Sequence, residues 1–100
     1  MLNSLLDFYA QNGVSLSEQG LKESVIQINR IDELLNLCSD LGLVILGGDM
    51  YRKTDKEFLP TYDNWYYDGD DMHQSIIEAR QYIGDFREKD GIYVALTIGL

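Results

Sequence analysis

The last nine residues of the chain have the alternating pattern of a strand with one covered face. Apolar residues at every second position alternate with residues of other kinds, the apolar ones being Ile92, Val94, Leu96, Ile98 and Leu100. A repeat of two residues is the spacing of side chains that share one face of a sheet. The chain therefore needs a sheet that contains residues 92–100, and other elements that cover one side of that sheet.

Three other segments have apolar residues at the spacing of amphipathic helices. Their apolar positions, in order along the chain, are Leu2, Leu5, Leu6 and Tyr9; Ile31, Leu34, Leu35, Cys38 and Leu41; and Met72, Ile76, Ala79, Ile83 and Phe86. We therefore expect three helices, each with one buried face.

Residues at the ends of these segments predict where the helices begin and end. Gly13 and Gly42 follow the first and second apolar stripes and are placed to end those helices. Asn29 stands three residues before an acidic side chain, which predicts an N-terminal cap for the second helix. Asp70 or Asp71 is expected to cap the third helix, where negative charge is favourable.

Residues 14–28 fit two structures. Leu21, Val25 and Ile28 lie at the spacing of one helical face, whereas residues 25–28 would also form a short strand. Both interpretations stay open on the sequence alone.

A hairpin is expected between the second and third helices. Residues 43–46 form a continuous apolar run, typical of a central strand that is covered on both faces. Gly47-Gly48 then predicts a bulge or a close approach of another backbone. Residues 52–56 are polar and predict the turn, and residues 58–62 would return as a strand. Pro60 places that strand at an edge, because proline cannot donate to the ladder.

These elements predict an α+β fold. A small sheet, made of the hairpin and the C-terminal strand and packed against about three helices, is the natural arrangement for them. One hundred residues are enough for one domain, so we predict a single domain over residues 1–100.

The net charge limits the kinds of partner. Seventeen Asp and Glu against eight Lys and Arg give a formal charge of -9. A nucleic-acid-binding protein concentrates Lys and Arg, so this balance argues strongly against nucleic acid as a direct partner. The same field would attract a basic protein and speed its encounter.

Cysteine content and hydropathy predict the compartment. Cys38 is the only cysteine, so no disulfide can form within the chain, and its place in an apolar stripe predicts a small core residue. The N-terminus lacks the pattern of a signal peptide, and no apolar run approaches the length of a membrane span. We expect a cytoplasmic protein without a membrane partner.

The acidic turn before the last helix has a structural explanation. Asp68, Asp70 and Asp71 do not match a calcium loop, so a turn and a helix cap is the favoured interpretation. A metal site would need Asp49 or Asp63 to join them in space. We predict no bound metal and no cofactor.

Hydrolase chemistry has little support. His73 is the only histidine, no nucleophile pattern accompanies it, and we expect it on the surface. Gly47-Gly48 lacks the other residues of a phosphate-binding or dinucleotide-binding motif. We therefore predict no catalytic residue and no enzyme.

The segment after the hairpin turn combines aromatic and acidic residues. Trp65 and Tyr51 either fill the space beside the Gly-Gly bend or take part in recognition. Tyr62, Tyr66 and Tyr67 cannot all point inward along one extended segment, and exposed Tyr beside Asp is typical of a recognition surface. Residues 61–79 hold five acidic side chains and no Lys or Arg.

Two runs in this region carry a resemblance to a known family. Leu46-Gly47-Gly48-Asp49-Met50-Tyr51 and Pro60-Thr61-Tyr62-Asp63-Asn64-Trp65-Tyr66 resemble bacterial polymorphic-toxin immunity proteins of immunity family forty. The resemblance continues through Ser75, Ala79, Tyr82 and Ile83 and through the last strand. It covers roughly the final sixty residues well, and the first part of the chain only by size and pattern.

The resemblance implies a small cytoplasmic α+β protein that is encoded beside a toxin. Such a protein binds its cognate toxin domain and blocks it without catalysis. Toxins of these systems include basic nucleases that pass between neighbouring cells, for example by contact-dependent growth inhibition.

We therefore predict an immunity protein that neutralises a basic toxin domain and is itself a monomer. The predicted toxin-binding residues are Asp49, Tyr62, Asp63, Tyr66, Asp68, Asp70 and Asp71. One alternative is a small hydrolase that uses Asp49 and Asp63 with a metal or water, if these carboxylates converge in a pocket. Another is an adaptor that dimerises through residues 92–100, if that strand lies at a sheet edge.

Overall fold

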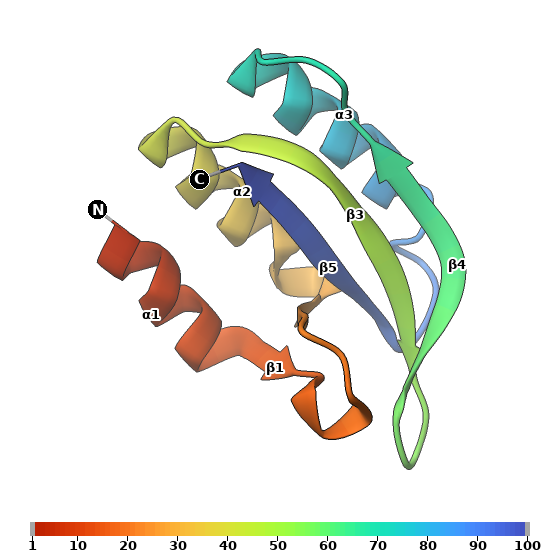
Figure 1. Ribbon diagram of the computed structural model, residues 1–100. Helices are drawn as coiled ribbons and strands as arrows, with labels where there is room; N and C mark the ends of the chain where they lie inside the picture. Colours follow the sequence, from red (N-terminus) through yellow and green to blue (C-terminus); the bar gives the residue numbers. More distant parts are fainter. Residues whose placement is uncertain (1, 100) are drawn as a thin grey trace.

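Residues 2–99, which a computed structural model describes, form three α-helices, two short 3-10 helices and five strands (Figure 1). Along the chain the elements are α1 (Leu2–Asn12), β1 (Gly13–Ser15), a 3-10 helix (Ser17–Gln19), β2 (Ser24–Gln27), a 3-10 helix (Ile28–Arg30), α2 (Ile31–Leu41), β3 (Val44–Lys53), β4 (Phe58–Tyr66), α3 (Met72–Gly84) and β5 (Ile92–Gly99). The predicted strand residue Leu100 and the side chain of Leu2 lie outside the described part.

The strands form one antiparallel sheet in the order β1-β2-β5-β3-β4. In Figure 1, α2 and α3 lie behind the sheet, and α1 lies beside them near β1. The α+β prediction is therefore confirmed, with the hairpin and the C-terminal strand joined by two further strands. We call the face of the sheet opposite α2 and α3 the outer face.

β5 is the middle strand of the sheet, so the edge strand that the adaptor alternative requires is not observed where β5 pairs with both β2 and β3. Its alternating pattern identified a strand but not its neighbours. β4 is an edge strand, as Pro60 indicated. β3 and β4 are joined by a turn in which the Thr54 amide donates to the Glu57 carbonyl over 2.8 Å.

Two local predictions differ from the structure. Asn29 does not cap α2, because residues 28–30 form a 3-10 turn that runs directly into the helix. Residues 43–46 are not covered on both faces. Ile45 is buried, but Val44 and Leu46 are half-buried, and the strand continues as far as Lys53.

Other helix ends agree with the sequence. Gly42 ends α2 in a left-handed conformation with φ 70°, and its amide donates to the carbonyls of Cys38 and Ser39. The Asp71 carboxylate caps α3 by accepting from the Gln74 amide at 3.0 Å. Gly13 follows α1 as the first residue of β1.

Residues 14–28 adopt the extended alternative over Ser24–Gln27, so the helical interpretation of this segment is wrong. The strand pairs with β1 on one side and β5 on the other. Its backbone hydrogen bonds to these distant segments decide the structure, and a periodicity count could not detect them.

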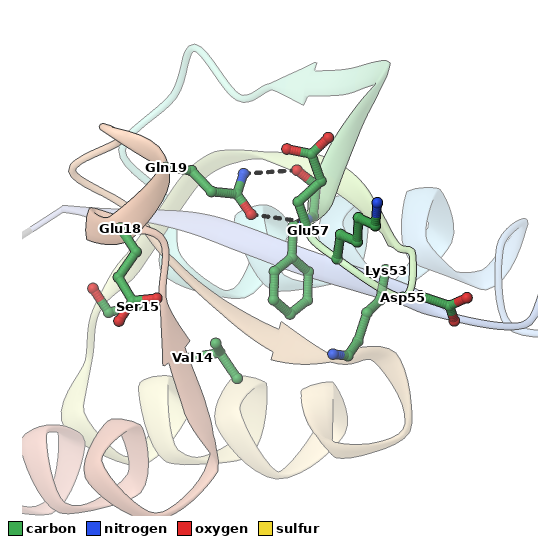
Figure 2. Close-up of a pocket in the computed structure, with 9 residues that line it drawn as sticks. Val14, Ser15, Glu18, Gln19, Lys53, Asp55 and Glu57 are labelled. Carbon is green, nitrogen blue, oxygen red and sulfur yellow. Dashed lines mark hydrogen bonds between the residues drawn. The ribbon is translucent and has the colours of Figure 1, made fainter.

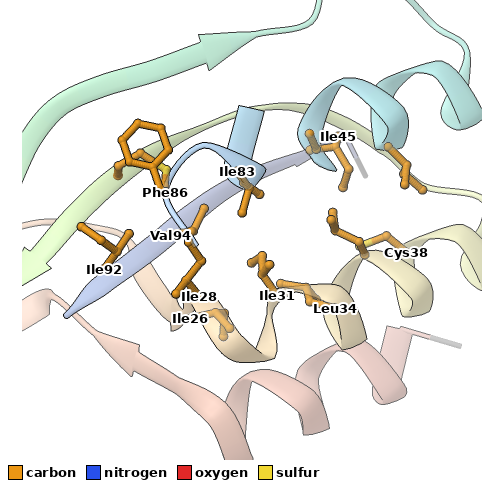
Figure 3. Close-up of a cluster of buried hydrophobic side chains, with 14 of the residues drawn as sticks. Ile26, Ile28, Ile31, Leu34, Cys38, Ile45, Ile83, Phe86, Ile92 and Val94 are labelled. Carbon is orange, nitrogen blue, oxygen red and sulfur yellow. The ribbon is translucent and has the colours of Figure 1, made fainter. Parts of the chain in front are cut away.

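The main core lies between the helices and the sheet (Figure 3). Ile31, Leu34 and Cys38 of α2 meet Ile45 of β3 and Val94 of β5, all fully buried. Cys38 is a core residue as predicted, and burial raises the pKa of its thiol to about 11. The thiol is therefore neutral at pH 7 and suits packing rather than nucleophilic attack.

A second apolar cluster lies on the outer face near the hairpin turn. Leu16 is 1% exposed and packs with Val25, Phe58 and Ala95. Figure 2 shows the amide of Gln19 bridging to the first residue of β4, accepting from the Phe58 amide at 2.7 Å and donating to its carbonyl at 2.8 Å. The segment after β1 therefore covers the hairpin half of the outer face and leaves the half near Gly47 open.

Candidate functional site

The Gly-Gly bend leaves room for the Trp65 ring. Gly48 pairs with Trp65 across the β3–β4 ladder, and a Cβ on Gly48 would lie 2.5 Å from the ring. A bulge between Ile45 and Gly47 interrupts the ladder with β5 at the same place. The Trp65 ring also packs on Tyr82 of α3, with centroids 5.0 Å apart. Of the two interpretations of Trp65, the packing role is therefore the one observed.

Tyr51 is also buried, at 5% exposed, and belongs to the second apolar cluster. Its hydroxyl donates to the Glu23 carboxylate across the outer face. This bond brings Glu23, from the segment before β2, toward Asp49. Burial, followed by the charge of Glu23, raises the pKa of Asp49 above its ordinary value.

β4 carries the two most exposed aromatic rings among the described residues. Tyr62 is 86% exposed and Tyr66 is 75% exposed, whereas Tyr67 is buried at 8% and its hydroxyl accepts from the Asp71 amide. Tyr62 has φ 66°, a left-handed conformation that is uncommon for a residue other than glycine. Two of the three tyrosines thus face water, as the sequence predicted.

A shallow hollow of about 340 Å³ lies on the outer face over the two glycines. Asp49, Asn64, Tyr66 and Thr97 surround it, and Gly47 and Gly48 are also among its lining residues. We call it the glycine hollow. It offers a carboxylate, an amide, a hydroxyl and an aromatic ring within one concave patch.

A groove of about 310 Å³ lies between β4 and α3. Its lining residues are Trp65, Tyr66, Glu78, Gln81, Tyr82 and Asp85. Burial raises the pKa of the Tyr82 phenol, and the nearby charges of Asp63 and Asp85 raise it further. We call this the β4–α3 groove; Trp65 and Tyr66 line both it and the glycine hollow.

Arg80 of α3 and Arg87, in the segment after it, turn away from this groove. Arg80 and Arg87 both bind the Asp32 carboxylate of α2, at 2.9 and 2.7 Å. Among the described residues that line the glycine hollow and the β4–α3 groove, none is Lys or Arg. The surface around Tyr66 is therefore negative on both sides of the strand.

The predicted binding residues come together only in part. Asp49 and Tyr66 line the glycine hollow, and Asp63 lies on the other face of β4, near Tyr82. Asp68, Asp70 and Asp71 are exposed in the loop between β4 and α3.

Sequence reasoning missed Glu23 and Asp85, and counted Glu78 only as part of an acidic run. No sequence pattern marked Glu23 as a site residue, because the structure of residues 14–28 was undecided and the approach of Glu23 to Asp49 depends on the fold. Glu78 and Asp85 are seven residues apart, which is two turns of a helix, so helical spacing alone could have paired them. Their position beside β4 depends on which face of α3 packs on the sheet.

The carboxylates required by the hydrolase alternative do not converge. Asp49 pairs with Asn64, so Asp63, the adjacent residue in β4, points to the opposite face of the sheet. Asp49 lines the glycine hollow and Asp63 does not. Within residues 2–99, no group of three His, Cys, Asp or Glu side chains is arranged to hold a metal ion.

Another cavity, of about 500 Å³, lies beside the hairpin turn (Figure 2). Glu18, Asp55 and Glu57 line it together with Lys53 and Lys56, so its charges are mixed. It therefore lacks the one-signed character of the surface around Tyr66. None of the helices within residues 2–99 has the length and apolar character that crossing a bilayer requires.

Comparison with known proteins identifies the family. Neither the curated proteins nor the solved structures contain a match to this chain. The family model described as Immunity protein 40 matches residues 15–98, which include the whole sheet except the first two residues of β1 and the last residue of β5, together with α2 and α3. The match covers most of the chain, and the protein therefore belongs to the Immunity protein 40 family.

Proposed function

We propose that this protein binds a cognate toxin domain in the cytoplasm of the cell that makes it, and blocks the toxin by occupying its surface without catalysis. The observation that carries the proposal is membership in the Immunity protein 40 family over residues 15–98. The geometry supports it, because exposed tyrosines and carboxylates lie along β4 and the loop after it, and the carboxylates of the hydrolase alternative point apart.

The docking surface we propose is centred on Tyr66. The glycine hollow and the β4–α3 groove flank this ring. Asp49 lines the hollow, Glu78 and Asp85 line the groove, and none of their described lining residues is Lys or Arg. Exposed tyrosines supply contact area and a hydroxyl, and they attract the cationic side chains of a partner. The partner face that fits is therefore rich in Lys and Arg.

A basic nuclease delivered between neighbouring cells, as in contact-dependent growth inhibition, is the toxin class that this surface suits best. A protein that binds nucleic acid concentrates positive charge where the phosphates lie. An acidic inhibitor surface complements that charge and speeds association. The protein would then cover the nucleic-acid-binding face of the toxin.

The first test is binding and protection. The C-terminal domain of the protein encoded immediately upstream should co-purify with this chain, and cells that express the chain should survive that domain. Failure of both with a folded protein would show that the proposal is wrong.

The second test locates the docking surface. The triple variant Asp63→Asn, Asp68→Asn and Asp70→Asn removes three exposed charges and keeps the Asp71 cap. At low salt we expect association with the toxin domain to slow by at least about tenfold, because steering depends on local charge.

The matched control removes three exposed charges elsewhere, with Asp7→Asn, Asp40→Asn and Asp90→Asn. Both variants have the same net charge, so only the site variant should slow association strongly. Equal slowing would show that net charge alone acts. Unchanged rates in both variants would show that Asp63, Asp68 and Asp70 do not steer the toxin domain.

A further inference from the structure

β5 is paired along its whole length on one side and only in part on the other. Its ladder with β3 runs from Ile92 to Gly99, but its ladder with β2 contains two pairs, ending at Val94. Beyond Val94, the ladder between β2 and β5 contains no further pair. Among the described residues, 95–99 therefore have no strand neighbour on the β2 side, and alternate peptide groups of this segment point toward that side.

A groove of about 590 Å³ lies along this free edge. Leu5, Leu6 and Tyr9 of α1 form one wall, and Leu96 and Ile98 of β5 form the other. The segment before β2 adds polar and charged lining residues, namely Lys22, Glu23 and Ser24. Leu6 is 65% exposed, which leaves a large apolar side chain in water. The groove thus combines two apolar walls, a charged end at Lys22 and Glu23, and a row of backbone donors and acceptors.

This edge lacks the protection that the hairpin end of β4 has. There, the Gln19 side-chain amide binds both the backbone N–H and the backbone carbonyl of Phe58. Pro60 has no backbone N–H to donate. Residues 95–99 contain no proline and no charged side chain, which are the usual means of blocking an exposed edge. The edge is therefore chemically able to pair with another backbone.

We infer that the free edge of β5 accepts an extended segment of the toxin polypeptide, which joins the sheet beside residues 95–99. This inference rests on the proposed function and adds a second contact, separate from the surface around Tyr66. Only an extended polypeptide offers donors and acceptors at the spacing of a strand edge, and its alternate apolar side chains would enter the groove against α1. The free edge is long enough for about five residues, or roughly 17 Å of strand.

A second copy of this chain does not fit the groove. In Figure 1, α1 runs alongside β5, so the outer edge of an inserted strand would face α1. Every strand in the described sheet is paired with at least one other strand. If a strand of a second copy entered the groove, the strand paired with it would collide with α1. A segment without a sheet behind it avoids this collision.

The test compares two exposed apolar residues on different helices. Leu6→Glu places a charge at the rim of the groove, and Ile77→Glu places the same charge on α3, where Ile77 is 48% exposed. With the toxin domain encoded upstream, we expect Leu6→Glu to dissociate at least about tenfold faster than the wild type, and Ile77→Glu to match the wild type.

Amide hydrogen exchange gives a readout that does not depend on a variant. In the complex, the amides of residues 95–99 that point away from β3 should exchange at least about tenfold more slowly than in the free protein. If the toxin binds but these amides and the Leu6→Glu complex are unchanged, the inference is wrong and the proposed function stands.

Two other outcomes also overturn the inference. Protection of the same amides in the free protein, with a concentration-dependent dimer by sedimentation, would show that a second copy occupies the edge. Absence of any binding by the wild-type chain would overturn the proposed function together with this inference.

Discussion

Tyr62 presents an exposed ring on a backbone conformation that costs free energy. Its φ of 66° and its exposed fraction of 86% mean that the fold gains little from the side chain. A left-handed conformation costs roughly 1–2 kcal/mol in a residue that has a Cβ. Such a residue is a reasonable contact for a partner, because its ring is already displayed.

Replacement of Tyr62 separates these two properties. Tyr62→Gly removes both the ring and the strain, whereas Tyr62→Ala removes only the ring. We expect the glycine variant to have a free energy of unfolding about 1 kcal/mol above that of the alanine variant, since glycine adopts positive φ without a Cβ clash. Urea denaturation measures this difference. Both variants should bind the toxin domain more weakly, and wild-type affinity in both would remove Tyr62 from the docking surface.

Asp49 is a second residue whose position opposes stability. Burial and the Glu23 charge raise the pKa of Asp49 in the folded protein above its ordinary value of 3.8. A group with a raised folded pKa stabilises the fold below the unfolded pKa, and this contribution is lost as pH rises through the folded pKa. At pH 7 the ionised Asp49 therefore lowers the free energy of unfolding.

Asp49→Asn should raise the urea midpoint at pH 7, because the amide has nearly the same shape and no charge. The difference from the wild type should shrink as the pH falls toward 3.8. Denaturation curves at several pH values test this. A variant that is less stable at pH 7 would show that the carboxylate contributes a favourable interaction instead.

At the scale of elements, one buried hydroxyl joins α3 to β3. The Ser75 hydroxyl accepts from the Ile45 amide at 3.0 Å and donates to the Met72 carbonyl at 2.7 Å. Ser75 is fully buried, and β4 leaves β3 at Gly47, before it could pair with Ile45. The hydroxyl therefore takes the place of a strand partner for that amide.

Ser75→Ala should lower the free energy of unfolding by about 1–3 kcal/mol, the cost of leaving a buried donor without a partner. Ser4→Ala on the exposed surface of α1 is the control and should change stability by less than about 0.5 kcal/mol. Thermal or urea denaturation of both proteins makes the comparison. Equal effects would mean that the Ile45 amide finds another acceptor.

At the scale of the whole molecule, net charge acts in opposite directions on stability and association. A charge of -9 repels itself within the folded protein and attracts a basic partner at a distance. Salt screens both effects, with a Debye length of about 10 Å at 0.1 M.

We therefore expect added salt to raise the urea midpoint of the free protein and to slow its association with the toxin domain. Stopped-flow mixing and denaturation at about 0.05 and 0.5 M salt measure the two responses. The Asp63, Asp68 and Asp70 triple variant should show a weaker salt dependence of association. A salt-independent association rate would mean that charge does not guide the encounter.

The sequence predicted most elements because their signals are local. Helical spacing found the three helices, alternation found β5, and Gly42 and Asp71 ended or capped their helices as expected. Asn29 failed as a cap because a preceding 3-10 turn made α2 continuous with residues 28–30. Residues 14–28 stayed undecided because β2 is stabilised by ladders to β1 and β5.

The sequence alone determined the class of fold, the acidic character of the chain and the two runs that mark its family, since periodicity, charge and motif are properties of neighbouring residues. Only the tertiary structure decided that Glu23 approaches Asp49, that Arg80 turns toward Asp32 and away from β4, and that β5 keeps a free edge. Each of these depends on packing and pairing between segments far apart in the chain, which local patterns do not encode.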